Sequence, residues 1–357
     1  MTIRRMNTKY LGAGFLYFYI HFVTELVCFY VLTAYVESPP IMWLIAFTYD
    51  MLAFAPQSLI GYLADKRKNI PFGLIGLCML AAALILREIG FSTFIPLIVL
   101  CFGNACTHVA GAEITLRVSN GSLTHSAVFV SGGSFGVVAG KLMASAGWPV
   151  WPLLMMIASA IPFDILARMD LKDAVSDGDQ PCEAFRYHDY RRSKYIVILL
   201  AVTVVAVRGY MAYGIPISWR KTTLQTVLLF SFMGIGKALG GVLSDIFGVR
   251  KTAVFSLLIA LPLMLFGDNN MYISLLGVTF FSMTMAVTLA VLVSVLPRAP
   301  GLAFGFTTIG LFLGALPVFF VKVTGFWQNC VMLSVMTALC VACMYFTIRK
   351  DEPDVHE

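Results

Sequence analysis

The chain has 357 residues, of which 59% are hydrophobic and only 12% are charged, and its formal net charge is +6. A soluble fold cannot hide this much apolar surface, so the composition predicts a protein whose solvent is the lipid bilayer. The eight cysteines show neither the spacing of a disulfide framework nor that of a zinc site, and we predict no metal and no cofactor.

Twelve apolar runs of roughly 18 to 27 residues follow one another, and each is long enough to cross about 30 Å of hydrocarbon as a helix. They are predicted near residues 10–36, 40–63, 70–88, 91–116, 122–146, 148–168, 195–217, 222–246, 251–267, 270–296, 299–321 and 326–348. Arg4, Arg5 and Lys9 precede the first run, which lacks a small-residue cleavage site and is interpreted as a retained helix.

The long polar connection from Asp170 to Lys194 divides the runs into six plus six. We therefore expect an amino-terminal bundle over residues 1–169, a cytoplasmic linker over 170–194 and a carboxyl-terminal bundle over 195–357. The fold class predicted is all-α, with twelve transmembrane helices.

Lys and Arg lie mainly on one side of this arrangement. With the amino terminus inside, about eighteen basic residues fall on inner segments and about four on outer ones, and cytoplasmic loops are enriched in basic residues. We expect a multi-pass protein of the plasma membrane with both termini in the cytoplasm. This bias accounts for the net charge, so no nucleic-acid partner is predicted.

One loop sequence occurs twice, about half a chain apart: GYLADKRKN from Gly61 to Asn69, and GGVLSDIFGVRK from Gly240 to Lys251. Each copy follows an apolar run, has a Gly four residues before an Asp, and continues with basic residues. Two hydrophobic halves that repeat one signature indicate a duplicated bundle of membrane helices, which is typical of secondary transporters.

Such a loop suits a contact that forms and breaks. A Gly in the last helical turn lets a neighbouring helix approach closely, and an Asp just beyond can accept hydrogen bonds from a helix amino terminus across the interface, with nearby cations holding the carboxylate. The alternative is that each Asp only caps a helix end. We predict a conformational latch formed by Gly61, Asp65, Gly241, Asp245, Gly248 and Arg250.

The second copy, G-x-x-x-D-x-x-G-x-R-K from Gly241 to Lys251, resembles the loop signature of the major facilitator superfamily. That signature occurs between the second and third helices and again between the eighth and ninth, which are its two places here. The first copy departs from it, because Lys68 replaces the second glycine and Ile70 replaces a basic residue. The resemblance implies two pseudo-symmetric six-helix bundles and transport by alternating access.

Two further segments are similar to fosmidomycin-resistance-type efflux proteins of bacteria: GNACTHVAGAE from Gly103 to Glu113 and FVSGGSFGVVAGK from Phe129 to Lys141. This similarity implies efflux across a bacterial inner membrane. The glycines of the second segment occupy the helix of the superfamily's antiporter motif, but the usual Pro beside them is absent. Close helix packing alone is the alternative explanation for these glycines.

Ionisable residues inside the predicted helices are the candidates for chemistry, because one Asp, Lys or Arg at a helix centre costs about 2.5 to 3.5 kcal/mol. His21 and Glu25 lie four residues apart on one face of the first helix, and Asp50 follows Tyr49 in the second. Desolvation favours a neutral carboxyl group, and imidazole titrates near neutral pH. We therefore expect Glu25, His21 and Asp50 to bind a coupling proton.

Alternatives remain for Glu25: a static ion pair with Arg208 or Lys141, or direct contact with the substrate. Arg208 is the strongest candidate for substrate contact, since a guanidinium binds carboxylate or phosphonate oxygens in a bidentate way. Lys237, one turn before the second signature loop, is interpreted as a lysine that extends to the membrane interface. The predicted substrate contacts are Arg208, His108, Asn104, Tyr49 and Lys141.

The function predicted is proton-coupled secondary transport of a small organic solute, anionic or drug-like, with efflux favoured. The alternative is a solute uptake carrier or a uniporter without proton coupling, and sodium is the other candidate coupling ion. No nucleophile motif or phosphate-binding GxxxxGK[ST] occurs, so neither an enzyme nor an ATP-driven pump is predicted. We expect a monomer.

Overall fold

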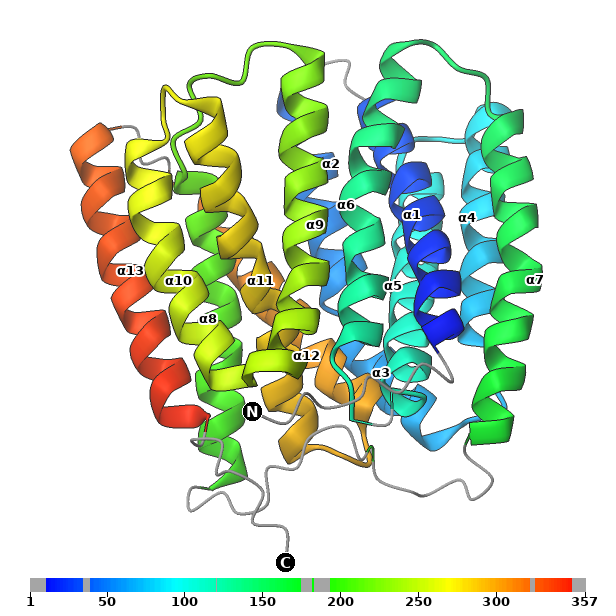
Figure 1. Cartoon of the computed structure of the whole chain (residues 1–357). Helices are drawn as coiled ribbons and strands as arrows, with labels where there is room; N and C mark the ends of the chain where they lie inside the picture. The colour runs from blue at the N-terminus through cyan, green and yellow to red at the C-terminus, as the bar shows by residue number, and fades with distance from the viewer. Residues whose placement is uncertain are drawn as a thin grey trace, which may run out of the picture.

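The computed structural model describes residues 11–34, 39–119, 121–174, 182, 193–321 and 325–348. Within these ranges the regular structure is helical (Figure 1). The first part contains α1 (Leu11–Ala34), α2 (Pro39–Phe54), α3 (Gln57–Lys66), α4 (Phe72–Glu88), α5 (Phe94–Arg117), α6 (Thr124–Ser145) and α7 (Trp151–Ala174). The second contains α8 (Lys194–Gly214), α9 (Thr223–Phe247), α10 (Val249–Phe266), α11 (Met271–Val295), α12 (Pro300–Ala315), η1 (Leu316–Phe319) and α13 (Phe326–Thr347).

These helices occupy the twelve predicted runs in order. The second run is divided into α2 and α3 by Ala55 and Pro56, because proline has no N–H to donate to the preceding turn. The eleventh run is α12 followed by the short 3₁₀ turn η1. Ten helices of the described chain are long and apolar enough to cross a membrane. The protein is therefore a multi-pass, all-α membrane protein, as the sequence predicts.

The helices form two groups that Figure 1 shows side by side, α1–α7 and α8–α13. In the first group α1 packs against α6, and α4 packs against α5 and α7; in the second, α8 packs against α12 and α13, and α10 against α11. Contacts of α6 with α9, and of α3 with α12, join the groups. The buried polar residues of the core lie between these packed helices.

The predicted domain boundaries remain predictions. The last helix of the first group, α7, continues to Ala174, past the expected end of the first bundle at residue 169. The remainder of the expected linker, apart from Cys182 and residues 193–194, lies outside the described residues, as do Arg4, Arg5 and Lys9.

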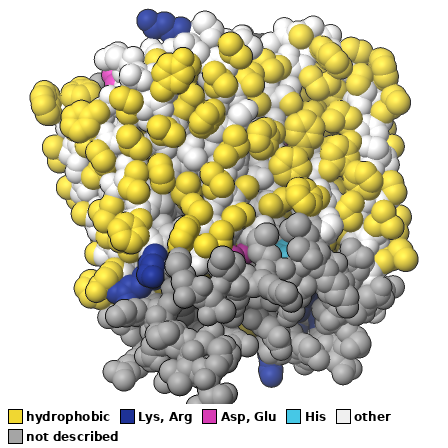
Figure 2. Space-filling model, viewed as in Figure 1, with side chains coloured by type: hydrophobic (Ala, Val, Ile, Leu, Met, Phe, Trp, Pro, Cys, Tyr) yellow, Lys and Arg dark blue, Asp and Glu magenta, His cyan; other side chains and the backbone are white. Residues whose placement is uncertain are grey.

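The outer surface of the bundle carries many large hydrophobic side chains, for example Leu59, Met155 and Phe255, each about 60% exposed or more. Figure 2 shows them spread over the middle of one face, with the visible Lys and Arg side chains toward its two ends. This pattern is expected of a surface that meets lipid hydrocarbon in the middle and water at both ends. Polar side chains are instead buried between the helices.

Candidate coupling and substrate site in the bundle core

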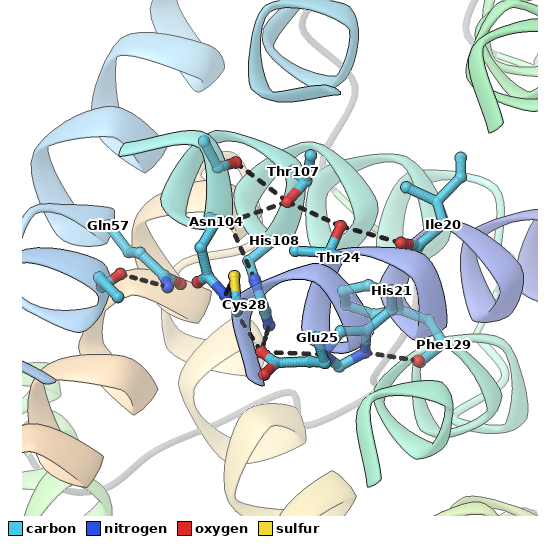
Figure 3. Close-up of polar contacts among 12 residues, drawn as sticks. Ile20, His21, Thr24, Glu25, Cys28, Gln57, Asn104, Thr107, His108 and Phe129 are labelled. Atoms are coloured by element: carbon cyan, nitrogen blue, oxygen red, sulfur yellow. Dashed lines mark hydrogen bonds and ion pairs between the residues drawn. The ribbon is translucent and has the colours of Figure 1, made fainter. Parts of the chain in front are cut away.

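Three buried side chains from two helices converge in the core (Figure 3). His21 and Glu25 come from one face of α1, and His108 comes from α5; each is at most 7% exposed. Glu25 Oε1 lies 3.2 Å from His108 Nε2 and 3.9 Å from His21 Nε2. One ligand atom from each residue lies within 4.8 Å of the other two, so these side chains could hold a metal ion. We call them the His–Glu cluster.

Backbone carbonyl groups fix the orientation of both imidazole rings. His21 Nδ1 lies 2.9 Å from the carbonyl oxygen of Phe129, and His108 Nδ1 lies 2.9 Å from that of Asn104. A carbonyl oxygen only accepts, so each Nδ1 carries the hydrogen. In the neutral ring Nε2 then has a free lone pair, and both Nε2 atoms face Glu25. His21 also lies against Gly133 of α6, where a Cβ would collide with its ring.

Asn104 connects this cluster to α2. Its amide nitrogen lies 3.2 Å from Glu25 Oε1, 3.1 Å from the Tyr49 hydroxyl and 3.4 Å from Cys28 Sγ. Its amide oxygen is buried and has no hydrogen-bond partner in the described structure. The structure thus brings Asn104, His108 and Tyr49, which the sequence predicts as substrate contacts, together with Glu25 and His21, which it predicts as proton sites.

Asp50 lies beside this cluster without joining it. Its carboxylate is half-buried and makes no hydrogen bond or ion pair with any residue that the structure describes. The suggested ion pair of Glu25 with Arg208 or Lys141 is also absent from the described residues, where the nitrogens nearest Glu25 Oε1 are those of Asn104 and His108, each at 3.2 Å.

Arg208 lies in the second group of helices and is 6% exposed. One terminal nitrogen donates to the carbonyl oxygen of Phe281 on α11 at 3.2 Å, and the guanidinium carbon lies 5.1 Å from the centroid of the Phe281 ring. Its Nε is buried without a hydrogen-bond partner. Within the described residues no carboxylate pairs with it, so this guanidinium keeps donors available for an anion.

Lys141 on α6 and Lys237 on α9 are both half-buried, and the roles predicted for them remain predictions. Lys141 Nζ lies 5.2 Å from the ring centroids of both Phe29 on α1 and Phe230 on α9, away from Glu25. Two aromatic faces stabilise this cation, which makes it a bridge between the two groups of helices. Lys237 makes no ion pair with any residue that the structure describes, and its interpretation as a lysine that extends to the interface stays a prediction.

At one end of the bundle, Asp245 caps the amino terminus of α6 from the opposite group. Its carboxylate accepts hydrogen bonds from the backbone N–H of Leu123 at 2.8 Å and of Thr124 at 3.0 Å. The hydroxyl groups of Ser122 and Thr124 each donate to Asp245 Oδ2 at 2.6 Å. The positive end of the α6 dipole further favours the carboxylate.

Asp65 makes the matching contact with α12. It accepts from the backbone N–H of Gly301 at 3.0 Å and of Leu302 at 2.8 Å. Arg117 of α5 donates to Asp65 Oδ1 at 3.2 Å and to Glu113 at 3.1 Å. Glu113 therefore belongs to this contact and not to the core, although it shares α5 with His108.

Three glycines permit these contacts. A Cβ on Gly61 would collide with the backbone of Gly301, and one on Gly241 would collide with Ala127 of α6. Gly248, which separates α9 from α10, has φ 94°, a conformation that side chains disfavour. Arg250 does not pair with Asp245 among the described residues, since its guanidinium lies 3.8 Å over the Tyr345 ring.

Sequence reasoning missed the partners of the two aspartates. Ser122 and Thr124 could have been found as a polar pair at the start of α6, where cap residues are expected. Arg117 carried no such signal, because a basic residue at a helix end is equally well explained by topology.

No protein-family model and no curated protein matches this chain. Solved structures match over nearly its full length. The Escherichia coli fucose:proton symporter FucP has a TM-score of 0.64 and 14% identity, over 97% of this chain and 100% of that chain, and FucP in the outward conformation gives the same values. The human organic anion transporter MFSD10 (TETRAN) has a TM-score of 0.65 and 16% identity, over 98% of this chain and 100% of that chain.

The chain therefore has the fold of the major facilitator superfamily transporters, as the sequence resemblance implies. These comparisons support the superfamily fold, and they give no support to the narrower fosmidomycin-resistance subgroup.

Proposed function

We propose that this protein is a secondary active transporter that moves a small organic anion across the membrane by alternating access. The observation that carries the proposal is Arg208: its guanidinium is buried, donates a hydrogen bond to Phe281, and has an Nε without a hydrogen-bond partner among the described residues. Removing a charge from water without a counter-ion is costly. An anionic solute that enters between the two groups of helices would supply the missing partner.

The proposed contact favours carboxylates and phosphonates. A planar guanidinium matches two oxygens of such a group and fixes the orientation of the bound solute. The similarity in fold to a human organic anion transporter is consistent with this solute class.

We assign the coupling proton to Asp50. Of the groups that the sequence predicts for this role, Glu25 and His21 lie close to each other and to His108, whereas Asp50 has no cation or hydrogen-bond donor as a partner within the described structure. A carboxyl group that is held in a membrane core without a cation can bind and release a proton as its access changes sides. One neighbour in fold, FucP, is a proton symporter.

The two aspartate caps would be the contacts that break when the structure opens at that end. Each joins one group of helices to the first turn of a helix in the other, so separation of the groups exposes both helix amino termini to water. For the direction of transport we favour efflux, on the sequence similarity alone. The second candidate is solute uptake, or uniport without a proton. Measuring solute transport in vesicles of both orientations, with and without a pH gradient, distinguishes the two candidates.

A ligand screen on the purified protein tests the solute class. We expect small carboxylates or phosphonates to raise the melting temperature of the wild-type protein and to lose this effect in the Arg208→Ala variant. Arg220→Ala is the matched control, because Arg220 is exposed in the loop before α9 and should leave the shift unchanged. Equal stabilisation of Arg208→Ala and wild type by the same anion would refute the contact.

A further inference from the structure

We propose that His21, Glu25 and His108 form a binding site for a divalent transition-metal cation. The proposal goes beyond anion transport and does not depend on it, because Arg208 is not one of the ligands. The sequence gives no metal-ligand spacing across these positions. Only the packing of α1 against α5 brings the three side chains together (Figure 3).

The distances between the donor atoms fit a metal. Zinc binds imidazole nitrogen and carboxylate oxygen at about 2.0 to 2.2 Å in tetrahedral geometry, which places two ligand atoms roughly 3.4 Å apart. Glu25 Oε1 lies 3.2 Å from His108 Nε2 and 3.9 Å from His21 Nε2, and all three atoms fall within 4.8 Å. A cation could be held with only small side-chain movements.

The hydrogen bonds around the cluster prepare these atoms for a cation. Metal-binding histidines usually donate the N–H of the other ring nitrogen to a carbonyl or carboxylate. Both rings here make that contact through Nδ1, to Phe129 and Asn104. Two nitrogen lone pairs and a carboxylate oxygen therefore face one another. Three acceptors at these distances repel unless a positive species lies among them.

A polar atom next to the cluster that has no hydrogen-bond partner among the described residues also supports a metal site. Asn104 is fully buried, donates to Glu25 through its amide nitrogen, and leaves its amide oxygen without a hydrogen-bond partner in the described residues. Buried polar atoms are rarely left in this state without a bound water or ion. Water bound to the cation would occupy the fourth coordination position and supply a donor for that oxygen.

The donor set selects the class of cation. Two imidazoles and one carboxylate suit Zn²⁺, Co²⁺ and related transition metals, whereas Mg²⁺ and Ca²⁺ require a shell of oxygen atoms. Phe304 of α12 covers the cluster from the other group of helices, with its ring centroid 6.4 Å from that of His108 and 6.2 Å from that of Phe129. If alternating access holds, the cation enters only when α12 moves away.

Metal titration of the full-length protein in lipid nanodiscs tests the site. After treatment with a chelator, we expect wild type to bind one equivalent of Zn²⁺ by calorimetry, and Co²⁺ to give the intense visible absorption of a tetrahedral site. Glu25→Gln, His21→Asn and His108→Asn should each weaken binding by more than about 100-fold. Asn104→Ala keeps all three ligands and should weaken it by about 10- to 100-fold, as loss of an outer partner does.

His125→Asn is the matched control. This histidine is equally buried, lies in α6 outside the cluster, and has no hydrogen-bond partner on either ring nitrogen in the described structure. Each variant must elute as the wild type does in size-exclusion chromatography. If a ligand variant does not fold, the Zn²⁺ affinity of Asn104→Ala decides whether the metal site exists. Wild type that binds neither metal, equal binding by folded ligand variants, or an Asn104→Ala affinity equal to wild type would overturn the proposal.

Failure of this proposal can be distinguished from failure of the proposed anion site. Arg208→Ala should bind Zn²⁺ as wild type does, although it should lose the stabilisation by an anion. Binding of Mg²⁺ as tightly as Zn²⁺ would also contradict the assignment, since it would indicate a site of oxygen ligands.

Discussion

Asp50 and Arg208 are ionisable residues of the core that have no counter-ion within ion-pair distance in the described part of the chain. Other ionisable groups of the core have polar or aromatic partners: Asn104 donates a hydrogen bond to Glu25, and aromatic rings lie against Lys141. An ionisable group without a partner in a membrane core is costly, so it points to function more strongly than a paired one. At the scale of single residues, we therefore propose the coupling role for Asp50 and the substrate role for Arg208.

Replacement of Asp50 by Asn should remove proton coupling. The amide cannot bind and release a proton, so accumulation of the solute driven by a pH gradient should fall to the level of protein-free liposomes. Exchange of solute without a gradient should persist. Asp268→Asn, in the loop before α11, is the control and should retain coupling. Gradient-driven accumulation by Asp50→Asn at the wild-type rate would assign the proton elsewhere.

A different buried residue should affect stability alone. The Tyr17 hydroxyl donates to Asp164 at 2.5 Å, and Arg168 donates to the other oxygen of the same carboxylate at 3.0 Å. Tyr17→Phe removes one of these partners from a buried charge and should cost about 1 to 3 kcal/mol of unfolding free energy. Thermal denaturation in detergent should show a lower midpoint for Tyr17→Phe. Tyr62→Phe, on the exposed surface, should leave the midpoint unchanged.

At the scale of helices, α6 packs directly on the backbone of α1. A Cβ at Gly132, Gly136 or Gly140 would collide with the carbonyl oxygen of Phe18, Phe22 or Leu26, respectively. This accounts for glycines at every fourth position without the proline of an antiporter motif. Close packing, the alternative weighed from the sequence, is sufficient to explain the pattern.

Gly136→Ala should therefore destabilise the protein. Over-packing of a tight contact typically costs about 1 to 3 kcal/mol, and the melting temperature should fall accordingly. Gly12→Ala on α1 is the matched control, because a Cβ there meets no atom within 4 Å. A change of equal size in both variants would contradict the packing explanation.

The two aspartate caps predict a reciprocal pattern of hydrogen exchange. Asp245→Ala removes the acceptor from the N–H groups of Leu123 and Thr124, so the first turn of α6 should exchange about 5- to 30-fold faster, as expected for loss of about 1 to 2 kcal/mol. Asp65→Ala should act instead on Gly301 and Leu302 at the start of α12. Mass spectrometry of the peptides that contain the first turns of α6 and α12 measures both effects. Unchanged exchange at both helix starts would show that the caps do not hold the groups together.

At the scale of the whole molecule, the charge distribution predicts which end of the bundle faces the cytoplasm. Lys68 and Arg298 are exposed in loops at the end where the aspartate caps lie, and Lys221 is exposed between α8 and α9. In a cysteine-free background, Lys221→Cys should react with a membrane-impermeant maleimide in intact cells. Lys68→Cys and Arg298→Cys should react only after permeabilisation. The reverse pattern would invert the predicted orientation.

The helices and their order could be predicted from the sequence, because a run of about 20 apolar residues in lipid must satisfy its backbone internally. The candidate site could be predicted only in part. The stacking of His21 and Glu25 follows from helical spacing, but apolar residues surround most of α1 and α5, so nothing marks which faces meet. The approach of His108 to Glu25 was therefore not foreseen.

By itself, the sequence determined a membrane-spanning, all-helical chain with a repeated Gly and Asp loop, since hydrophobic length and local spacing act within one segment. The tertiary structure decided which ionisable groups are paired: it brought His21, Glu25 and His108 together and, within the described residues, left Asp50 and Arg208 without counter-ions. That division depends on the rotation of each helix about its axis. Contacts between distant helices set this rotation, and the sequence of a helix that is apolar on most sides does not indicate it.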